Sequence, residues 1–329
     1  MTIGGTARNP DKSFVGRDGP LADLAGWLAA DTAGVALLVG RPGSGRSALL
    51  RRFTIDPPTP IAAVIDARGR TAEDTRAAVT TALGGTEPTL ASDVIRRATA
   101  ALGPAIVIDG LDEAAQGDRL ATGYVLARLA DEGARLIVAT DHCVQTRRLL
   151  RPRLTVDLNA PNTVSGNHRD LSRHLAEVLG GFEGPYGAST TLLAQLCAHR
   201  AEGGFLVGRA LAAALRRHPA SAARDAVAEL PDTIGGLIDA DLALIAPAER
   251  RRVRAMLAAL AWAEGPGLPP PLWPILATAL SGVRHDDHDV SITLRHASHY
   301  IEQSISPTLF RLAHHCFVEH LREVDRGRR

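Results

Sequence analysis

The sequence contains almost no lysine and little cysteine. Lys12 is the only lysine among 37 lysine and arginine residues, so the remaining basic residues are all arginine. The three cysteines, Cys143, Cys197 and Cys316, are far apart and odd in number, which argues against a disulfide framework and a zinc site. No apolar run approaches the roughly 20 residues that cross a bilayer, and no cationic, apolar leader opens the chain. We therefore expect a cytoplasmic protein with no membrane segment.

The composition is that of an enzyme-sized globular chain. The 329 residues are 45% hydrophobic and 22% charged, with a formal net charge of +1. A chain of this length can bury a sizeable core in two or three domains. Its arginine pairs are scattered, and the near-zero net charge gives no continuous basic surface, so nucleic acid is not an expected partner.

A glycine-rich segment is the clearest motif. Residues 40–47 read Gly-Arg-Pro-Gly-Ser-Gly-Arg-Ser, between the apolar run 34–39 and the helical pattern 48–53. This is the order of strand, glycine turn and helix in a phosphate-binding loop, whose amide N–H groups point at a polyphosphate. A tight strand-to-helix turn without a ligand is the alternative for this segment alone. The motif predicts a nucleotide site made of Gly40, Arg41, Pro42, Gly43, Ser44, Gly45, Arg46, Ser47 and Ala48.

Arg46 stands where this motif normally has lysine. The scarcity of lysine throughout the chain supplies a neutral explanation. The exchange still changes the chemistry, because guanidinium is planar and forked whereas an ammonium is a compact point charge. We expect Arg46 to bind phosphate but to position it poorly for hydrolysis.

A second strand, 105–108, ends in an acidic cluster. Asp109 follows the strand directly, and Asp112 and Glu113 come just after it. A carboxylate at the end of a buried strand beside a phosphate loop is where Mg2+ is held, with the Ser47 hydroxyl as the other protein ligand. Asp112 and Glu113 are candidates to accept a proton from an attacking water. The alternative for Asp109 is a helix cap or turn residue.

The alternation of strand and helix patterns along the chain predicts an α/β fold, in which a P-loop parallel sheet flanked by helices is followed by helical domains. Short apolar strands are expected near 34–39, 61–66, 105–109, 135–140 and 153–158, alternating with helical stretches. After residue 159, apolar residues at three-and-four spacing indicate helices. We expect a flexible arm at 1–12, a nucleotide domain at 13–158, a helical domain at 159–231 and a winged-helix domain at 232–329. The segments 300–304 and 308–312 should pair as its wing.

Four segments together resemble a known family. They are Phe14-Val-Gly-Arg17, the phosphate loop, Ile108-Asp-Gly-Leu-Asp-Glu-Ala114 and Phe310-Arg-Leu-Ala-His-His-Cys-Phe-Val-Glu-His-Leu321. Their order and content are similar to NACHT-type STAND ATPases, which are AAA+-related signalling switches. The resemblance runs from about Ser13 to Leu321 and includes the Walker A and Walker B motifs.

The resemblance implies further site residues. Val15 and Gly16 would lie against the adenine, and Phe205 would cover the base. His314 would contact the β-phosphate of ADP and hold a closed, inactive form. Phe205 as an ordinary core residue and His314 as a cap at the junction of wing and helix are the alternatives.

One segment departs from the family pattern. After the strand 136–139, the family usually has threonine or serine followed by arginine, whereas this chain has Thr140-Asp141-His142. Arg147 could replace the missing γ-phosphate sensor, although a solvated arginine is the alternative. Together with Arg46, this departure points to slow or absent hydrolysis. Residues 285–289, His-Asp-Asp-His-Asp, have metal-ligand side chains, but we expect a polar loop there.

The sequence therefore predicts an ATP/ADP-binding, Mg2+-dependent signalling switch. Slow ATP hydrolysis would control a closed-to-open transition and a nucleotide-dependent homo-oligomer. No repeat array or amino-terminal effector is evident, so we expect effector or sensor proteins in trans. The alternative is a non-hydrolysing, nucleotide-locked scaffold for such partners. A small-molecule kinase is a third class, for which no acceptor site is visible.

Overall fold

The computed structural model describes most of the chain outside its ends and several connecting segments. Phe14 and Val15 lie outside the described residues, so the expected adenine contact of Val15 is not described. No helix in the described ranges is long and apolar enough to cross a membrane. These ranges are 16–30, 33–82, 105–115, 117–180, 189–201, 204–217, 231, 233–265, 267–303 and 308–326.

A five-stranded parallel sheet forms the first part of the molecule, in the order β2-β3-β4-β1-β5. All five strands lie where the apolar runs of the sequence predict them. The strands are β1 (Gly34–Val39), β2 (Ile61–Asp66), β3 (Ala105–Asp109), β4 (Arg135–Thr140) and β5 (Leu154–Asp157).

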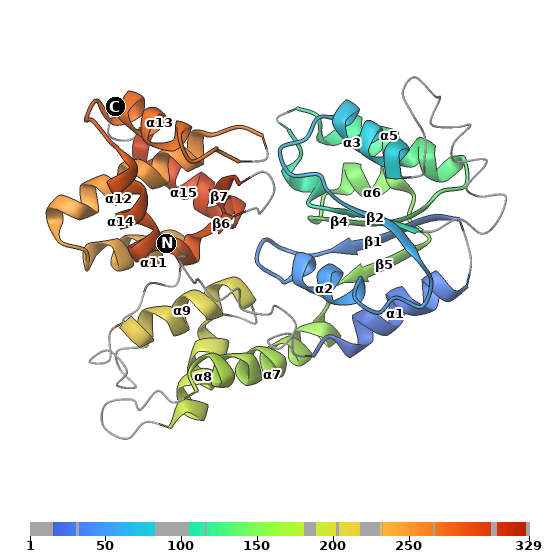
Figure 1. Ribbon diagram of the computed structural model, residues 1–329. Helices are drawn as coiled ribbons and strands as arrows, with labels where there is room; N and C mark the ends of the chain where they lie inside the picture. The colour runs from blue at the N-terminus through green and yellow to red at the C-terminus, as the bar shows by residue number, and fades with distance from the viewer. Residues whose placement is uncertain are drawn as a thin grey trace.

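Helices cover both faces of this sheet (Figure 1). Val35, Leu37 and Val39 pack with α3, α5 and α6, whereas Ala36 and Leu38 pack with α1 and α2 on the opposite face. Burial on both faces explains why the strands are continuous apolar runs. The helices are α1 (Asp18–Ala29), α2 (Arg46–Phe53), α3 (Ala72–Ala82), α5 (Arg119–Asp131) and α6 (Val144–Leu150), and the short 3-10 helix η2 (Leu111–Glu113) follows β3.

The strand order brings separate motifs to one edge of the sheet. β4 lies between β3 and β1, and Thr140 at its end is aligned with Val39, the residue before the phosphate loop. Asp109 ends β3 and is aligned with Asp66 at the end of β2. Since all the strands are parallel, these residues meet at the carboxyl edge, where ligands bind in such sheets.

Among the described residues, three helices follow the sheet and share a second apolar core, to which Leu237 of the next region also contributes. Leu171, Leu175, Leu193, Cys197 and Leu211 are all buried in it. This is the helical stretch that the three-and-four spacing predicts. The helices are α7 (Pro161–Val178), α8 (Thr190–Arg200) and α9 (Phe205–Arg217).

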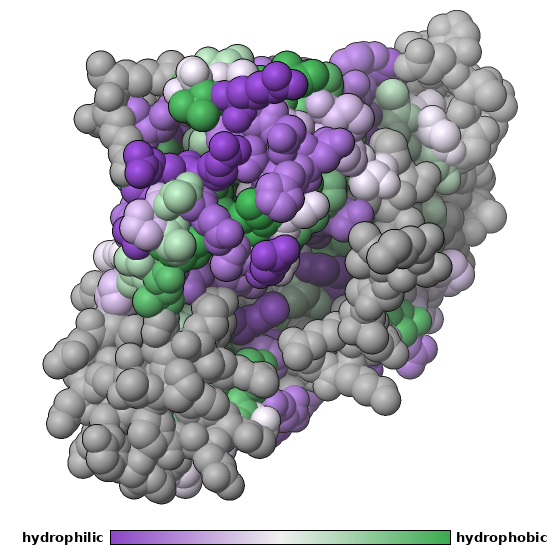
Figure 2. All heavy atoms as spheres, turned by 60° about the vertical axis from the view of Figure 1, so that its left-hand side comes forward, coloured by the Kyte–Doolittle hydropathy of each residue, from purple (hydrophilic) through white to green (hydrophobic). Residues whose placement is uncertain are grey.

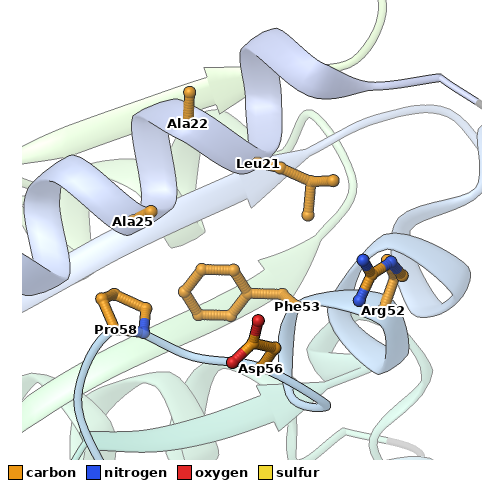
Figure 3. A pocket seen from close by; sticks show the side chains of 7 residues that line it. All are labelled: Leu21, Ala22, Ala25, Arg52, Phe53, Asp56 and Pro58. Atoms are coloured by element: carbon orange, nitrogen blue, oxygen red, sulfur yellow. The ribbon is translucent and has the colours of Figure 1, made fainter.

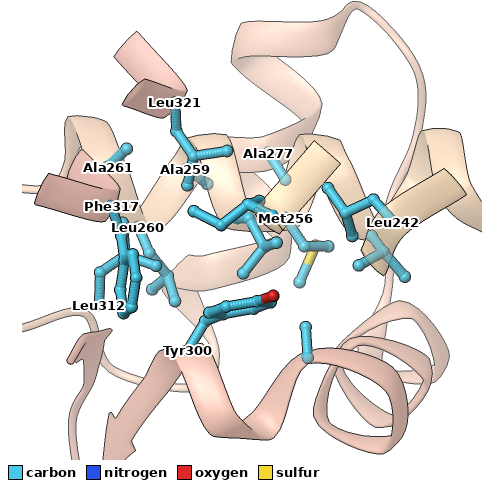
Figure 4. Close-up of a cluster of buried hydrophobic side chains, with 14 of the residues drawn as sticks. Leu242, Met256, Ala259, Leu260, Ala261, Ala277, Tyr300, Leu312, Phe317 and Leu321 are labelled. Atoms are coloured by element: carbon cyan, nitrogen blue, oxygen red, sulfur yellow. The ribbon is translucent and has the colours of Figure 1, made fainter. Parts of the chain in front are cut away.

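The C-terminal region, residues 233–326 as described, has a third core (Figure 4), in which Tyr300 and Phe317 pack edge to face beside Met256 and Leu260. Its two short strands pair antiparallel, Ile301 with Leu312, as the sequence predicts. Figure 1 shows this hairpin on the side of the region that faces the sheet. The elements are α11 (Ile234–Ala243), α12 (Pro247–Trp262), α13 (Leu272–Ser281), α14 (Asp287–Ala297), η5 (Ser298–Tyr300), β6 (Ile301–Gln303), β7 (Phe310–Leu312) and α15 (His315–Arg326).

The expectation of a polar loop at residues 285–289 holds for His285 and Asp286 but is wrong for residues 287–289. Asp286 caps α14 through a capping box with Asp289, and the helix begins at Asp287. The first turn brings His285 Nδ1 to 3.1 Å from Asp289 Oδ2, with both side chains buried. The run of charged residues gave no sign that His285 and Asp289, four residues apart, would pair at a helix start.

Candidate functional site

The phosphate loop has the backbone geometry that its glycines allow. Gly43 and Gly45 have φ angles of 78° and 92°, in the left-handed region that favours glycine. A Cβ on Gly43 would lie 2.7 Å from Leu206 Cβ, so the close approach of α9 also requires glycine. α2 begins at Arg46, and its amino end therefore faces the loop. Ser44 and Arg46 are buried, whereas Arg41, Pro42 and Ala48 are exposed.

Arg46 is paired with one of the predicted catalytic acids. Its Nη2 donates a hydrogen bond of 2.8 Å to Asp112 Oδ2, and both side chains are 8% exposed. Among the described residues, Arg46 Nη1, Asp112 Oδ1 and Ser44 Oγ are buried without a hydrogen-bond partner. Buried polar atoms without partners are costly, so this cluster is suited to a ligand that supplies the missing partners.

The two predicted Mg2+ ligands contact each other. The Ser47 hydroxyl donates a hydrogen bond to the Asp109 carboxylate. Burial raises the pKa of Asp109, although this hydrogen bond and the charge of Arg68 oppose the rise. One hydroxyl and one carboxylate suit Mg2+, which takes few protein oxygens and completes its shell with water and phosphate. Within the described ranges no group of three or more His, Cys, Asp or Glu residues could hold a metal ion by itself.

Glu113 lies in the same cluster as a partly buried acid. Burial raises its pKa, and the charge of Arg68 has the largest opposing effect. A carboxylate becomes a stronger base as its pKa rises, so the raised pKa suits Glu113 to accepting a proton. Asp112 is held by the Arg46 hydrogen bond instead.

His314 lies against the phosphate loop from the C-terminal region. The Gly43 N–H donates a hydrogen bond of 2.9 Å to His314 Nε2, across 271 residues of sequence. The Cys316 N–H points at the other ring nitrogen, Nδ1, at 3.3 Å, and Cys316 Sγ lies 3.0 Å from that atom. A neutral imidazole accepts at only one nitrogen, so the Gly43 bond forms in the tautomer that carries its proton on Nδ1. Burial, followed by the charges of Arg46, His315 and Arg68, lowers the pKa of His314 to about 4, so the imidazole is neutral at physiological pH.

Arg17 and α9 cover the other side of the loop. Arg17 Nη2 donates a 2.5 Å hydrogen bond to the Ser44 carbonyl, and its guanidinium lies 5.2 Å from the ring centre of Phe205. Leu206 N–H donates to the Gly43 carbonyl at 3.3 Å. A Cβ on Gly16 would lie 1.9 Å from the Asp170 carboxylate. The structure thus brings Phe205 and His314 close to the phosphate loop, whereas Gly16 packs against Asp170 of α7.

Arg119 is a residue that the sequence reasoning missed. From the start of α5 it forms a bidentate ion pair with Asp141, and its Nη2 lies 3.4 Å from Thr140 Oγ1 at the end of β4. Arg147, the substitute considered from the sequence, is exposed. Asp141, the acid that follows Thr140, is the sequence feature that indicates a nearby cation, because a carboxylate at a partly buried strand end requires one.

An open groove lies elsewhere, at the far end of α2 from the phosphate loop (Figure 3). Leu21, Ala22 and Ala25 of α1 line one side of it. Arg52, Phe53, Asp56 and Pro58 line the other. Its polar groups are one arginine and one aspartate, and it shares no residue with the phosphate loop.

Comparison with solved structures agrees with this description. A STAND protein with a tetratricopeptide repeat sensor from Pyrococcus horikoshii superposes with a TM-score of 0.53 at 14% identity, over 94% of this chain. The fold is that of a P-loop NTPase. The chain spans 42% of the length of that STAND protein. No family model matches the chain, and no curated protein matches its sequence.

Two further solved structures superpose more loosely, and the fold assignment does not depend on them. A Walker-type ATPase of Pyrococcus abyssi gives a TM-score of 0.44 at 14% identity, over 95% of this chain and 97% of that one. Drosophila ORC bound to DNA gives 0.42 at 15% identity, over 94% of this chain and 87% of the other.

Proposed function

We propose that this chain is an ATP- and ADP-binding switch of the NACHT-type STAND class, in which a winged-helix C-terminal region closes over the phosphate loop. The observation that carries the proposal is the hydrogen bond between the Gly43 N–H and His314 Nε2. A loop amide that points at phosphate in a P-loop NTPase is here bonded to a side chain of the distant C-terminal region. Closure and nucleotide binding therefore use the same group.

The residues around the loop support binding of a di- or triphosphate. Arg46 and Ser44 offer buried donors, and Ser47 with Asp109 would hold Mg2+, which would neutralise phosphate charge. Once phosphate accepts from the Gly43 N–H, His314 is released from that bond. In the neutral tautomer with its proton on Nε2, His314 accepts from the Cys316 N–H at Nδ1 and donates to phosphate from Nε2.

Hydrolysis would be slow in this arrangement. Arg46 is bound to Asp112 and Arg119 to Asp141, so each of these two arginines must exchange a carboxylate for phosphate. Glu113 is the group best placed to take the proton of a water molecule. In this proposal ATP favours an open form that self-associates, and ADP favours the closed one.

The Arg46–Asp112 pair also supports a second function, a scaffold that retains nucleotide without turnover. A buried pair of this kind is costly to separate, since each partner left alone is an unpaired buried charge. A chain that never separates it would bind nucleotide but not align it for hydrolysis.

The test is to denature the purified protein, identify any released nucleotide, and then follow a single turnover of added ATP with Mg2+. Near-stoichiometric ADP together with slow phosphate release supports the switch. Retained ATP without product supports the scaffold. A protein that carries no nucleotide and binds neither ATP nor ADP contradicts both.

A further inference from the structure

The C-terminal hairpin contacts the sheet at a second place, away from His314. Arg311 of β7 donates a 2.9 Å hydrogen bond through Nη2 to Asp66 Oδ2 at the end of β2. These residues are 245 positions apart in the sequence. Arg311 also donates to Glu302 of its own hairpin, at 3.2 Å from Nε and 3.0 Å from Nη2. The same guanidinium therefore connects the sheet with the hairpin.

A second arginine approaches from the sheet side. Arg68 donates to Asp66 through Nε at 2.8 Å and Nη2 at 3.0 Å, and its Nη1 lies 3.6 Å from Glu302 Oε2. Asp66 and Arg68 belong to the sheet, and Glu302 and Arg311 to the hairpin. Each of the two arginines therefore has one acidic neighbour on its own side of the interface and one across it.

The four side chains are shielded enough for their charges to matter. Arg68 is 17% exposed, Arg311 24%, and the two acids 36% each. Burial acts to raise the pKa of Asp66, but the hydrogen bonds and charges of Arg68 and Arg311 outweigh it and hold the pKa below the usual value. Partly buried pairs are screened by salt less than surface pairs, yet they remain weaker in salt.

Arg68 and Gly69 are also closely packed, the first against Gly110 after β3 and the second against Gly265 of the C-terminal region. A Cβ on Gly110, directly after Asp109, would lie 2.6 Å from Arg68 Cγ. A Cβ on Gly69 would lie 2.6 Å from the Gly265 carbonyl oxygen of the C-terminal region. This segment therefore lies between the proposed Mg2+ residue and the C-terminal region. Where it is coloured, the face of the molecule turned forward in Figure 2 carries many hydrophilic residues.

We propose that Asp66, Arg68, Glu302 and Arg311 form an ionic latch that keeps the C-terminal region closed over the phosphate loop independently of His314. The inference rests on the proposed switch for its role in regulation, but the latch itself does not depend on nucleotide. Because its members are charged, the latch weakens with salt, whereas the neutral His314 contact does not.

The experiment measures the open fraction of the nucleotide-free full chain by small-angle X-ray scattering at about 0.05 M and about 0.5 M salt. The variants are Arg311→Gln and Glu302→Gln. Arg295→Gln is the matched control, because Arg295 is an exposed arginine of α14 in the same region. A variant with four substitutions, Asp66→Arg, Arg68→Asp, Glu302→Arg and Arg311→Glu, reverses every charge of the latch and so again places opposite charges side by side.

We expect high salt to expand the wild-type chain and Arg311→Gln to raise its open fraction about tenfold at low salt, the effect of one charged contact. Glu302→Gln should have a smaller effect in the same direction, and the variant with four substitutions should be compact again. Circular dichroism checks that each variant is folded. An Arg311→Gln chain as compact as Arg295→Gln would overturn the latch.

Nucleotide binding, measured on the same samples, separates the two proposals. If the wild type binds no nucleotide while Arg311→Gln opens the chain, the latch stands and the switch fails. If ADP binds tightly while neither Arg311→Gln nor Glu302→Gln opens the chain, the latch fails and the switch stands.

Discussion

The carboxyl edge of the sheet and the C-terminal region each have an arginine–aspartate pair with a buried aspartate side chain, and the two pairs differ in how many of the aspartate oxygens are hydrogen-bonded. Asp289 is fully buried and accepts from Arg252 with both oxygens, at 2.9 and 2.8 Å, and His285 lies beside it. Asp112 accepts from Arg46 with one oxygen, and its other oxygen has no hydrogen-bond partner in the part of the chain that the structure describes. The first pair completes a helix start, whereas the second is left incomplete where a ligand is proposed to bind.

The comparison distinguishes a pair that stabilises the fold, Arg252–Asp289, from a pair whose arginine can exchange its carboxylate for a ligand, Arg46–Asp112. Hydrogen bonds and charge hold the pKa of Asp289 below its usual value despite burial, as expected for a structural carboxylate. Around the phosphate loop, burial raises the pKa values of Asp109 and Glu113 instead. Perturbed acids with unsatisfied neighbours are typical of functional sites.

The largest effect should come from Asp289→Ala. This change removes the capping box of α14 and the bonds from Arg252, so we expect a loss of about 3 kcal/mol in the free energy of unfolding. Urea denaturation measures it. ADP affinity of the folded fraction should not change, and a loss below about 0.5 kcal/mol would show that Asp289 is not structural.

Asp112→Asn should destabilise the nucleotide-free chain by about 2 kcal/mol, because Arg46 loses its buried counter-charge. Unlike the loss in Asp289→Ala, this one should shrink when ADP is added, since phosphate replaces the carboxylate as the partner of Arg46. Thermal unfolding with and without ADP measures the difference. An ADP-induced shift in Tm equal to that of the wild type would mean that Arg46 stays away from the ligand.

Much of this fold follows from the sequence, and the reason is physical. Strands such as 34–39 and 105–109 are buried on both faces, so they appear as apolar runs, and the glycine loop marks the start of α2. The position of His314 was expected only through the family resemblance. Arg119, in contrast, reaches Asp141 across 22 residues and Arg311 reaches Asp66 across 245. Such pairings depend on side-chain geometry between elements, which periodicity does not encode.

Arg46→Lys should raise steady-state ATP turnover a few-fold. Lysine is a compact point charge that suits the position between phosphates, and it pairs less rigidly with Asp112 than a guanidinium does. Phosphate release at saturating ATP measures the change. Unchanged or lower turnover, with the variant folded and binding ATP, would indicate that the arginine is not what limits hydrolysis.

The smallest effect should be that of mild acid on the closed form without nucleotide. His314 can accept from the Gly43 N–H only while its ring is neutral. Burial in the closed form favours the neutral ring and lowers the pKa of His314 to about 4. The contact is complete above the unfolded pKa of about 6.5 and is lost as pH falls towards 4, with a roughly fourfold weakening at pH 6. Scattering at pH 7.5 and 6 in the wild type and in His314→Ala isolates the effect. Equal pH dependence in both would contradict it.

The central claim, that His314 couples closure to the nucleotide, is tested most directly by the rate at which ADP leaves the folded protein. His315→Ala is the matched control, because His315 is adjacent and about half exposed. We expect His314→Ala to release ADP about tenfold faster than the wild type, as the loss of one phosphate contact predicts, and His315→Ala to release it at the wild-type rate. Equal rates in all three proteins would contradict the account.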